Sequence, residues 1–236
     1  MEDIDAIASL RDPVRRRLYE YVAAQDREVG RNEAAEAAGV QRTLAAFHLD
    51  RLVEAGLLEA ASRRLTGRSG PGAGRPAKVY RRSAAERQVS LPARDYRTAA
   101  DLLAETAEAA GLDAELWEVA RRRGRELRDP GGRPCADLAE AAALLVARGY
   151  EPFMDGAAAG AEAEPESEGG PGARPALRLR NCPFKVVADR FPPLVCGMNL
   201  ALLEGLLEGS EALRARMDAR PGLCCVVVEP SKNNED

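Results

Sequence analysis

The sequence is poor in histidine, lysine and aromatic residues. Its 236 residues include one histidine and three lysines, and aromatic residues make up 4%. A single histidine excludes a metal site built from several histidines. No apolar run approaches the length of a membrane-spanning helix, and the acidic start lacks the apolar segment of a secretory signal. We therefore expect a cytoplasmic protein with no membrane partner, whose five cysteines are thiols or ligands rather than disulfides.

Charge is distributed unevenly along the chain. Residues 1–90 contain 16 Lys/Arg and 13 Asp/Glu, a net charge of +3, whereas residues 91–236 contain 18 and 25, a net charge of −7. A basic half joined to an acidic half indicates that the basic half binds nucleic acid. Because hydrophobic residues make up 45% of the chain, there is enough apolar material for two small domains with cores.

Local signals in the first part predict three helices, two strands and a glycine-rich loop. Asp12-Pro13 is typical of a helix start, because the carboxylate caps free N–H groups and proline has none to lose. We expect the next helix to be capped by Asn32 and ended by Gly39. The third helix, the two strands and the loop between them are expected at 41–55, 57–60, 78–80 and 66–76. This is the order of a winged helix-turn-helix.

The third helix and the loop carry the candidate DNA contacts. Side chains at the start of a helix in the major groove can reach base edges, and arginines on the loop can reach phosphates. Phe47 lies away from the apolar stripe and could meet a thymine methyl. His48 borders the core, so it is either a packed histidine or a DNA contact. The candidate set is Gln41, Arg42, Thr43, Phe47, His48, Arg51, Arg63, Arg64, Arg68, Arg75 and Lys78.

The segment Gln41–Leu58 resembles the recognition helix and following strand of the ArsR-like winged-helix repressors. The resemblance covers about residues 5–82. It implies a transcription regulator that binds a double-stranded DNA operator as a homodimer. It does not indicate what such a regulator would sense.

The rest of the chain is expected to form a helical linker and a sensor domain. Residues 91–148 form the predicted linker or dimerisation region, and either of its first two helices could be the dimer seam. Residues 149–230 form the predicted cysteine-bearing domain, with a flexible loop at 156–176 and a tail at 231–236 after it. The expected fold class is therefore α+β, with a winged helix at 1–90. The three linker helices are expected at Tyr96–Ala110, Asp113–Arg128 and Asp137–Arg148.

Four of the five cysteines lie in the last 55 residues. Asn181-Cys182-Pro183 and Pro192-Pro193 each predict a helix start, which places Cys182 and Cys196 near helix N-termini that favour thiolates. Cys224 and Cys225 fall in a β-branched run that predicts a strand. Since neighbours on a strand face opposite ways, these two should not both reach one centre without a bulge. Cys135, in a loop, is interpreted as a bystander.

Three interpretations of these cysteines compete. They are buried and inert, they bind zinc, or they hold an iron–sulfur cluster; Cys-Pro at 182–183 also allows a haem thiolate. Zinc sites usually contain close Cys-x-x-Cys pairs, and gaps of 13 and 27 residues do not have that form. A cluster is larger and is commonly held by thiolates from distant segments.

The segments Leu179–Phe184, Leu194–Asn199 and Pro221–Cys225, with Gly149–Pro152 before them, resemble the C-terminal half of the Suf-operon repressors and their relatives. The resemblance implies a cluster, for instance 4Fe–4S, on Cys182, Cys196 and Cys224. The Suf-operon repressors control iron–sulfur assembly genes, but related regulators outside the Suf system share the same cysteines, so the resemblance does not imply the target genes. Ser210 stands where a further cysteine is expected. The fourth ligand is then Cys225, an external group, or one of the carboxylates Glu204, Glu208 and Glu211.

These features predict a homodimeric DNA-binding regulator, a repressor, whose cysteines sense redox or iron–sulfur status through a cluster. One alternative is a thiol- or zinc-sensing winged-helix regulator with the same cysteines. Another, from a different class, is a cluster-carrying factor whose winged helix binds proteins. The sequence contains no pairing of nucleophile and base and no phosphate-binding loop between strand and helix, so we do not expect an enzyme.

Overall fold

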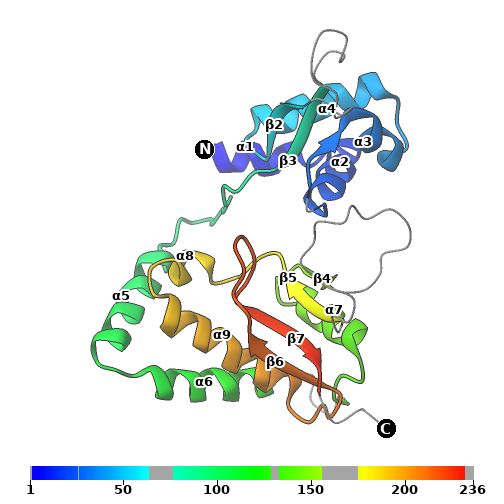
Figure 1. The fold of residues 1–236 in the computed structure, drawn as a ribbon. Coiled ribbons are helices and arrows are strands. Elements are labelled where there is room, and N and C mark those ends of the chain that lie inside the picture. Colours follow the sequence, from blue (N-terminus) through cyan, green and yellow to red (C-terminus); the bar gives the residue numbers. More distant parts are fainter. Residues whose placement is uncertain (1, 26, 64–76, 129–132, 156–174, 232–236) are drawn as a thin grey trace. The chain divides into compact units, whose positions relative to one another are not determined.

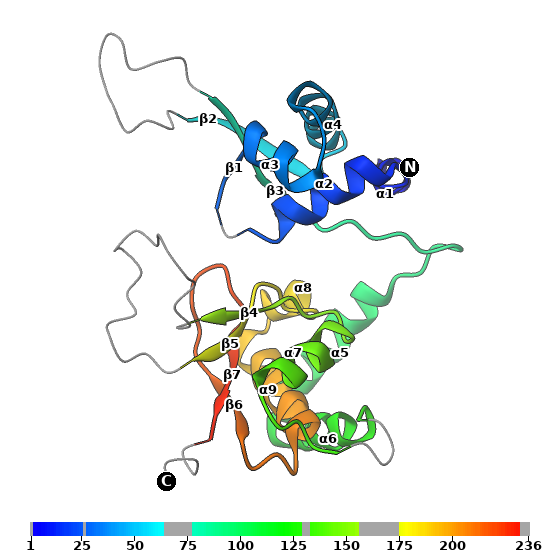
Figure 2. The ribbon, with the colours of Figure 1, turned by 90° about the vertical axis from the view of Figure 1, so that its right-hand side faces the viewer.

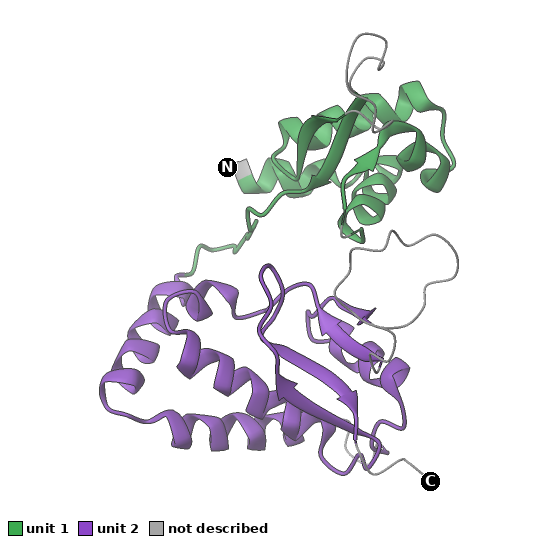
Figure 3. Ribbon diagram, in the orientation of Figure 1, with its two compact units in different colours: residues 1–94 green, residues 95–236 purple. Residues whose placement is uncertain are grey.

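The computed structural model describes residues 2–25, 27–63, 77–128, 133–155 and 175–231. The chain divides into two compact units, Met1–Arg94 and Asp95–Asp236 (Figure 3). Each unit combines helices with an antiparallel sheet. The helices of residues 91–148, which the sequence suggested as a separate linker, belong to the second unit.

The described part of the first unit contains four helices and a three-stranded antiparallel sheet (Figure 1). The strands lie in the order β1-β3-β2, and Tyr80 of β3 pairs with Val29 on one side and Ala60 on the other. The elements, in chain order, are α1 (Glu2–Ser9), α2 (Pro13–Ala23), β1 (Val29–Gly30), α3 (Arg31–Ala38), α4 (Arg42–Glu54), β2 (Leu58–Arg63) and β3 (Ala77–Arg82).

Two of the three predicted helix-terminus signals act as expected. The carboxylate of Asp12 accepts hydrogen bonds from the N–H groups of Val14 and Arg15, both at 2.9 Å, at the start of α2. Gly39 ends α3 with a φ of +65°, a conformation that costs glycine nothing. The prediction that Asn32 caps α3 is wrong: the helix begins at Arg31, because β1 pairs with β3 through Gly30 and the chain turns into the helix at once.

The predicted apolar stripe of the third helix forms the core of this unit. Ala45, Leu49 and Leu52 of α4 are fully buried. The β2–β3 ladder is longer than expected, since it pairs Leu58 with Arg82 at one end and Arg63 with Ala77 at the other. The loop expected at 66–76 lies outside the described residues.

The second unit packs helices on one face of a four-stranded antiparallel sheet of order β4-β5-β7-β6. Figure 2 shows α7 and α9 on the same side of this sheet, and α6 packs against α9. The predicted linker helices are confirmed to within two residues at each end. No helix in the described part of the chain is long and apolar enough to cross a bilayer. The elements are α5 (Tyr96–Ala109), α6 (Asp113–Glu126), α7 (Leu138–Val146), β4 (Pro152–Asp155), β5 (Ala176–Leu179), α8 (Lys185–Ala188), α9 (Pro192–Leu207), β6 (Leu213–Met217) and β7 (Val226–Pro230).

Helices α6 and α9 cross so closely that their backbones touch. A methyl group added to Gly205 would lie 2.0 Å from the carbonyl oxygen of Arg121, and one added to Gly124 would lie 2.2 Å from that of Leu202. The guanidinium of Arg121 also pairs with Glu204 across the crossing, at 2.6 Å. Glycine at both contact points therefore fixes the position of α9.

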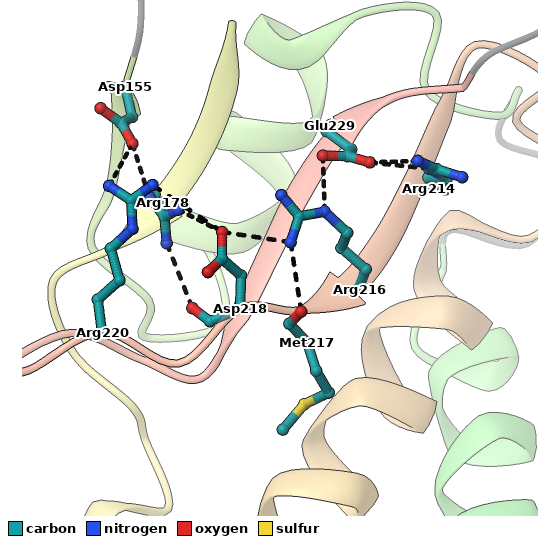
Figure 4. Close-up of polar contacts among 8 residues, drawn as sticks. All are labelled: Asp155, Arg178, Arg214, Arg216, Met217, Asp218, Arg220 and Glu229. Atoms are coloured by element: carbon teal, nitrogen blue, oxygen red, sulfur yellow. Dashed lines mark hydrogen bonds and ion pairs between the residues drawn. The ribbon is translucent and has the colours of Figure 1, made fainter. Parts of the chain in front are cut away.

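A network of ion pairs covers the sheet face opposite these helices (Figure 4). Arg178 of β5, whose side chain is 4% exposed, pairs with Asp155 and Asp218. A buried arginine needs such partners, because an unpaired buried charge is strongly unfavourable. The hydrogen bond from Arg178 holds the pKa of Asp218 below its usual value. Arg220 pairs with Asp155 at 3.0 Å, so Asp218 and Arg220 both tie the loop between β6 and β7 to this network.

Candidate functional site

Four cysteines from three separate segments line one pocket of about 290 Å³ in the second unit. Cys182 follows β5, Cys196 lies in α9, and Cys224 and Cys225 immediately precede β7. The sulfurs form two pairs: Cys196 Sγ lies 3.0 Å from Cys225 Sγ, and the thiol of Cys182 is hydrogen-bonded to Cys224. The pocket is also lined by Arg180, Asn181, Lys185, Ala188, Asp189, Pro192, Asn199, Gly222 and Leu223.

The loop between β6 and β7 folds back to bring the last two cysteines to the pocket. The N–H of Cys224 donates to the carbonyl of Leu179 at 3.0 Å, which places Cys224 beside the end of β5, three residues before Cys182. The N–H of Asp218 donates to the carbonyl of Cys225 at 2.7 Å and closes the loop at its base. Since Asp218 is itself held by Arg178 (Figure 4), the ion-pair network anchors this loop.

The prediction that Cys224 and Cys225 lie within a strand, and so should not both reach one centre without a bulge, rests on a premise that the structure contradicts. It assumed that both residues lie within a strand, where neighbours alternate. The strand β7 begins only at Val226, so the two cysteines belong to the preceding loop, and both line the pocket.

The helix start predicted at Pro192-Pro193 is confirmed, because α9 begins at Pro192, whereas the start predicted at Cys182-Pro183 is displaced. α8 begins at Lys185, three residues after Cys182, and Cys196 is the fifth residue of α9, beyond its first turn. The N–H of Phe184, just before α8, lowers the pKa of Cys182, but this effect is smaller than the effects that raise it. The hydrogen bond to Cys224 and burial raise the pKa of the Cys182 thiol, and burial raises the pKa of Cys196 to about 12.

Cys224 is instead the cysteine whose environment favours the thiolate. The hydrogen bond from Cys182, with further N–H donors, lowers the pKa of the Cys224 thiol to about 7. One of those donors is the side chain of Asn199, whose Nδ2 lies 3.3 Å from Cys224 Sγ. The Oδ1 of Asn199 accepts a hydrogen bond from the hydroxyl of Tyr150 at 2.6 Å. Sequence reasoning gave Asn199 no role, although it lies three residues after Cys196 and so on the same face of α9.

Thiolates are soft ligands that select zinc, copper(I) and iron–sulfur clusters. Among the described residues, no three His, Cys, Asp or Glu side chains are arranged to hold a single metal ion. An iron–sulfur cluster is commonly held by thiolates from separate segments of the chain, and the four cysteines of this pocket supply such a set. Arg180 and Lys185 also line the pocket, and Lys185 pairs with Asp189 of the same lining at 2.8 Å.

Of the alternatives for a fourth ligand, Cys225 is the one at the pocket. Glu204 pairs with Arg121 and Glu208 with Arg125, and neither they nor the exposed Glu211 belong to the described lining. Ser210, which stands at the expected position of a further cysteine, donates to the carbonyl of Cys135 at 2.7 Å. Cys135 is likewise outside the described lining.

The predicted DNA contacts at the start of α4 are exposed in the first unit. Gln41, Arg42 and Thr43 are open to solvent, as are Phe47 and Arg51. The guanidinium of Arg51 stacks on the ring of Phe47 at 5.6 Å and pairs with Glu54. Arg42 and Lys78 line a groove of about 810 Å³ between the start of α3, the start of α4 and the β2–β3 hairpin, together with Arg27, Glu28, Gly30, Arg31, Asn32, Glu33, Ser62 and Ala77.

The other candidate contacts have internal partners or lie outside the described residues. His48 is buried at 6% exposure, and its Nδ1 accepts a long hydrogen bond from Arg15, at 3.5 Å, as the packed interpretation expects. Arg63 pairs with Glu28 at 2.8 Å, and Lys78 pairs with Asp50 at 2.7 Å. The predicted contacts outside the described residues are Arg64, Arg68 and Arg75.

No protein-family model, curated protein or solved structure matches this chain. A functional conclusion therefore depends on the geometry of the chain's own residues. Two features carry that information: the four-cysteine pocket of the second unit, and the exposed start of α4 in the first.

Proposed function

We propose that the protein is a homodimeric DNA-binding transcription regulator, a repressor, whose second unit holds an iron–sulfur cluster on Cys182, Cys196, Cys224 and Cys225. The observation that carries the proposal is the meeting of four cysteines from three segments at one pocket. The order of helices and strands in the first unit supports a winged helix there.

DNA binding is supported by the exposed start of α4 in the first unit. The core takes one face of α4 and leaves its start free, so Gln41, Arg42 and Thr43 have no packing role. A helix 10–12 Å across fits the major groove, which is about 12 Å wide. The hairpin of β2 and β3 then serves as the wing beside it. We leave the buried His48 out of the proposed contacts.

Replacing Arg42 by alanine is expected to weaken DNA binding about tenfold, because one charge-assisted contact to a base or phosphate is lost. The measurement is fluorescence anisotropy with a duplex selected from a random-sequence library, at several salt concentrations. If Arg42 contacts a phosphate, the salt slope should also fall by about one unit.

Arg122 provides the matched control, because it is also an exposed arginine on a helix, α6 of the second unit. Arg122→Ala should leave affinity and salt slope unchanged. Equal losses in both variants would show that affinity follows total charge rather than α4. If the wild-type protein binds duplex DNA with no salt dependence or not at all, the protein-interaction alternative replaces this proposal.

An apolar face of α5 suits a second copy of the chain. Helix α5 meets the rest of its unit through Ala104 and Ala107, whereas Leu102 and Leu103 are 60% and 72% exposed. Two copies of α4 must lie about one DNA turn apart, ~34 Å, to occupy successive major grooves. A regulator of this kind therefore needs a two-fold partner, and the same face on both copies can form an isologous contact.

Leu103→Arg is expected to convert the dimer to a monomer, because it would place a charge in an apolar seam. We expect the dimer dissociation constant, measured by sedimentation, to rise by at least about tenfold, or 1.4 kcal/mol. Val146→Arg is the control, since Val146 is an exposed apolar residue on α7, away from α5. A wild-type protein that is monomeric at micromolar concentration, or a dimer equally sensitive to both changes, would contradict the assignment.

The position of α5 also suggests how the pocket communicates with DNA binding. When bound, an iron–sulfur cluster supplies a redox-active group to which all of its cysteine ligands are attached. The cysteines lie just after β5, in helix α9 and in the loop before β7. A cluster bound to all of them would link these segments, and its loss would release them from one another. Helix α5 contacts α8 and α9, and its Asp101 pairs with Arg190 between them at 2.5 Å. It starts at Tyr96, just beyond the last residue of the first unit, and so connects the two.

A thiol sensor is the second candidate, and one observation favours it. The four thiols already lie as two pairs, with Cys196 Sγ and Cys225 Sγ only 3.0 Å apart. Such a protein would respond to oxidants through its thiols alone. Iron and sulfide analysis of anaerobically purified protein separates the two functions, because a thiol sensor contains neither.

A further inference from the structure

Asn199 is buried beside the cysteine pocket and has a different partner at each end of its amide. It is 1% exposed, and it is the one amide side chain among the buried residues of α9, a helix described over its whole length. A buried amide without partners would be unfavourable. Asn199 has two partners, the Tyr150 hydroxyl at 2.6 Å and Cys224 Sγ at 3.3 Å.

The two partners determine which way the amide faces. A cysteine sulfur that is deprotonated or bound to a metal can only accept a hydrogen bond, so the Nδ2 group must face Cys224. The remaining Oδ1 then faces Tyr150, whose hydroxyl donates to it. Tyr150 is itself buried, at 3% exposure. The tyrosine therefore holds the amide in the orientation that directs an N–H toward the sulfur.

We propose that Asn199, held in place by Tyr150, sets the reduction potential of the cluster by donating a hydrogen bond to Cys224. This inference rests on the proposed function and concerns the same pocket. A hydrogen bond to a ligating sulfur stabilises negative charge there, and the reduced form carries one more negative charge than the oxidised form. Asn199 therefore stabilises the reduced form more than the oxidised form.

The backbone N–H groups of Val226 and Cys225 also donate to Cys224, but the side chains of Asn181 and Lys185 act differently. Asn181 accepts from the N–H of Glu151 and donates to the carbonyl of Gly149, both at 2.7 Å, so its bonds go to the backbone. Lys185 pairs with Asp189 at 2.8 Å. Asn199 is a positioning residue that acts through Cys224.

The test is a one-electron titration of the reconstituted protein with dithionite and mediators, followed by absorbance and paramagnetic resonance. Asn199→Ala should lower the ratio of reduced to oxidised cluster at a given potential about tenfold, which is 59 mV for a one-electron couple. Tyr150→Phe keeps the ring and removes only the hydroxyl, so it should shift the ratio in the same direction by a smaller factor, about threefold.

Ser210→Ala is the control, because it also removes a side-chain hydrogen bond of this unit, but one to the carbonyl of Cys135 outside the pocket lining. It should leave the titration unchanged. If Asn199→Ala fails to fold, the Tyr150→Phe titration decides alone. Variants with the wild-type potential would overturn the role of Asn199 and leave the proposed function standing. A wild-type protein that takes up no cluster would overturn the proposed function, and this inference with it.

Discussion

Serine in place of Cys225 is expected to remove the cluster. Cys225 lines the pocket with its sulfur 3.0 Å from that of Cys196, which makes it the fourth ligand in our proposal. A serine hydroxyl rarely loses its proton near neutral pH, so the oxygen cannot replace a thiolate. The protein should be reconstituted anaerobically, and its absorption near ~400 nm compared with its iron and sulfide content. We expect all three to fall to background.

The fifth cysteine supplies the control for this experiment. Cys135→Ser should retain iron, sulfide and absorption, because Cys135 is not among the described residues of the pocket. Serine at Cys182, Cys196 or Cys224 should behave like serine at Cys225. Full retention of iron and sulfide in Cys225→Ser would contradict the four-cysteine site and return the fourth position to a carboxylate or an external group.

Alanine in place of Gly205 is expected to destabilise the second unit severely. Glycine in a helix is ordinarily worse than alanine by about 0.5–1 kcal/mol, so the default expectation is a gain in stability. Here the added methyl would lie 2.0 Å from a backbone carbonyl of α6, which cannot move without separating the two helices. We expect a loss of ~3 kcal/mol or more in the free energy of unfolding.

The single tryptophan of the chain reports this change directly. The Trp117 indole donates to the carbonyl of Leu194 at 3.1 Å, and it would touch any side chain at Gly197, so it senses the contact of α6 with α9. Urea denaturation should be followed by its fluorescence in Gly205→Ala and in Gly124→Ala. Both variants should unfold at lower urea concentration than the wild type. A transition at equal or higher urea concentration would show that the crossing is not as tight as the structure has it.

Signals confined to a few neighbouring residues predicted much of the first unit. The Asp12-Pro13 start, the Gly39 end and the buried stripe of α4 all depend on local periodicity and capping. Asn32 failed as a cap because a two-residue strand, β1, ends at Gly30, and its pairing with β3 depends on residues some fifty positions away. Local capping preference cannot include a constraint of that kind.

The candidate site was predictable only in part, for the same reason. The sequence pointed to Cys182, Cys196 and Cys224 as candidate ligands. Cys225 was only an alternative, because the sequence predicted a strand over Cys224 and Cys225, whereas β7 begins one residue after Cys225. The meeting of the four sulfurs depends on the bond from Cys224 to Leu179 and on the anchoring of Asp218 by Arg178. The contact of Asn199 with Tyr150 joins residues 49 positions apart, and the approach of Gly124 to Gly205 likewise joins distant segments.

The most direct test of the account is the affinity of one protein preparation for DNA with and without its cluster. An operator selected from a random-sequence library should be titrated anaerobically with cluster-loaded protein and with the same protein after removal of iron and sulfide. If the cluster at the four cysteines controls the placement of the α4 helices, the two affinities should differ by about 5–150-fold, the usual range of coupling between sites. Equal affinities of a loaded and an unloaded dimer would contradict the claim that the pocket regulates DNA binding.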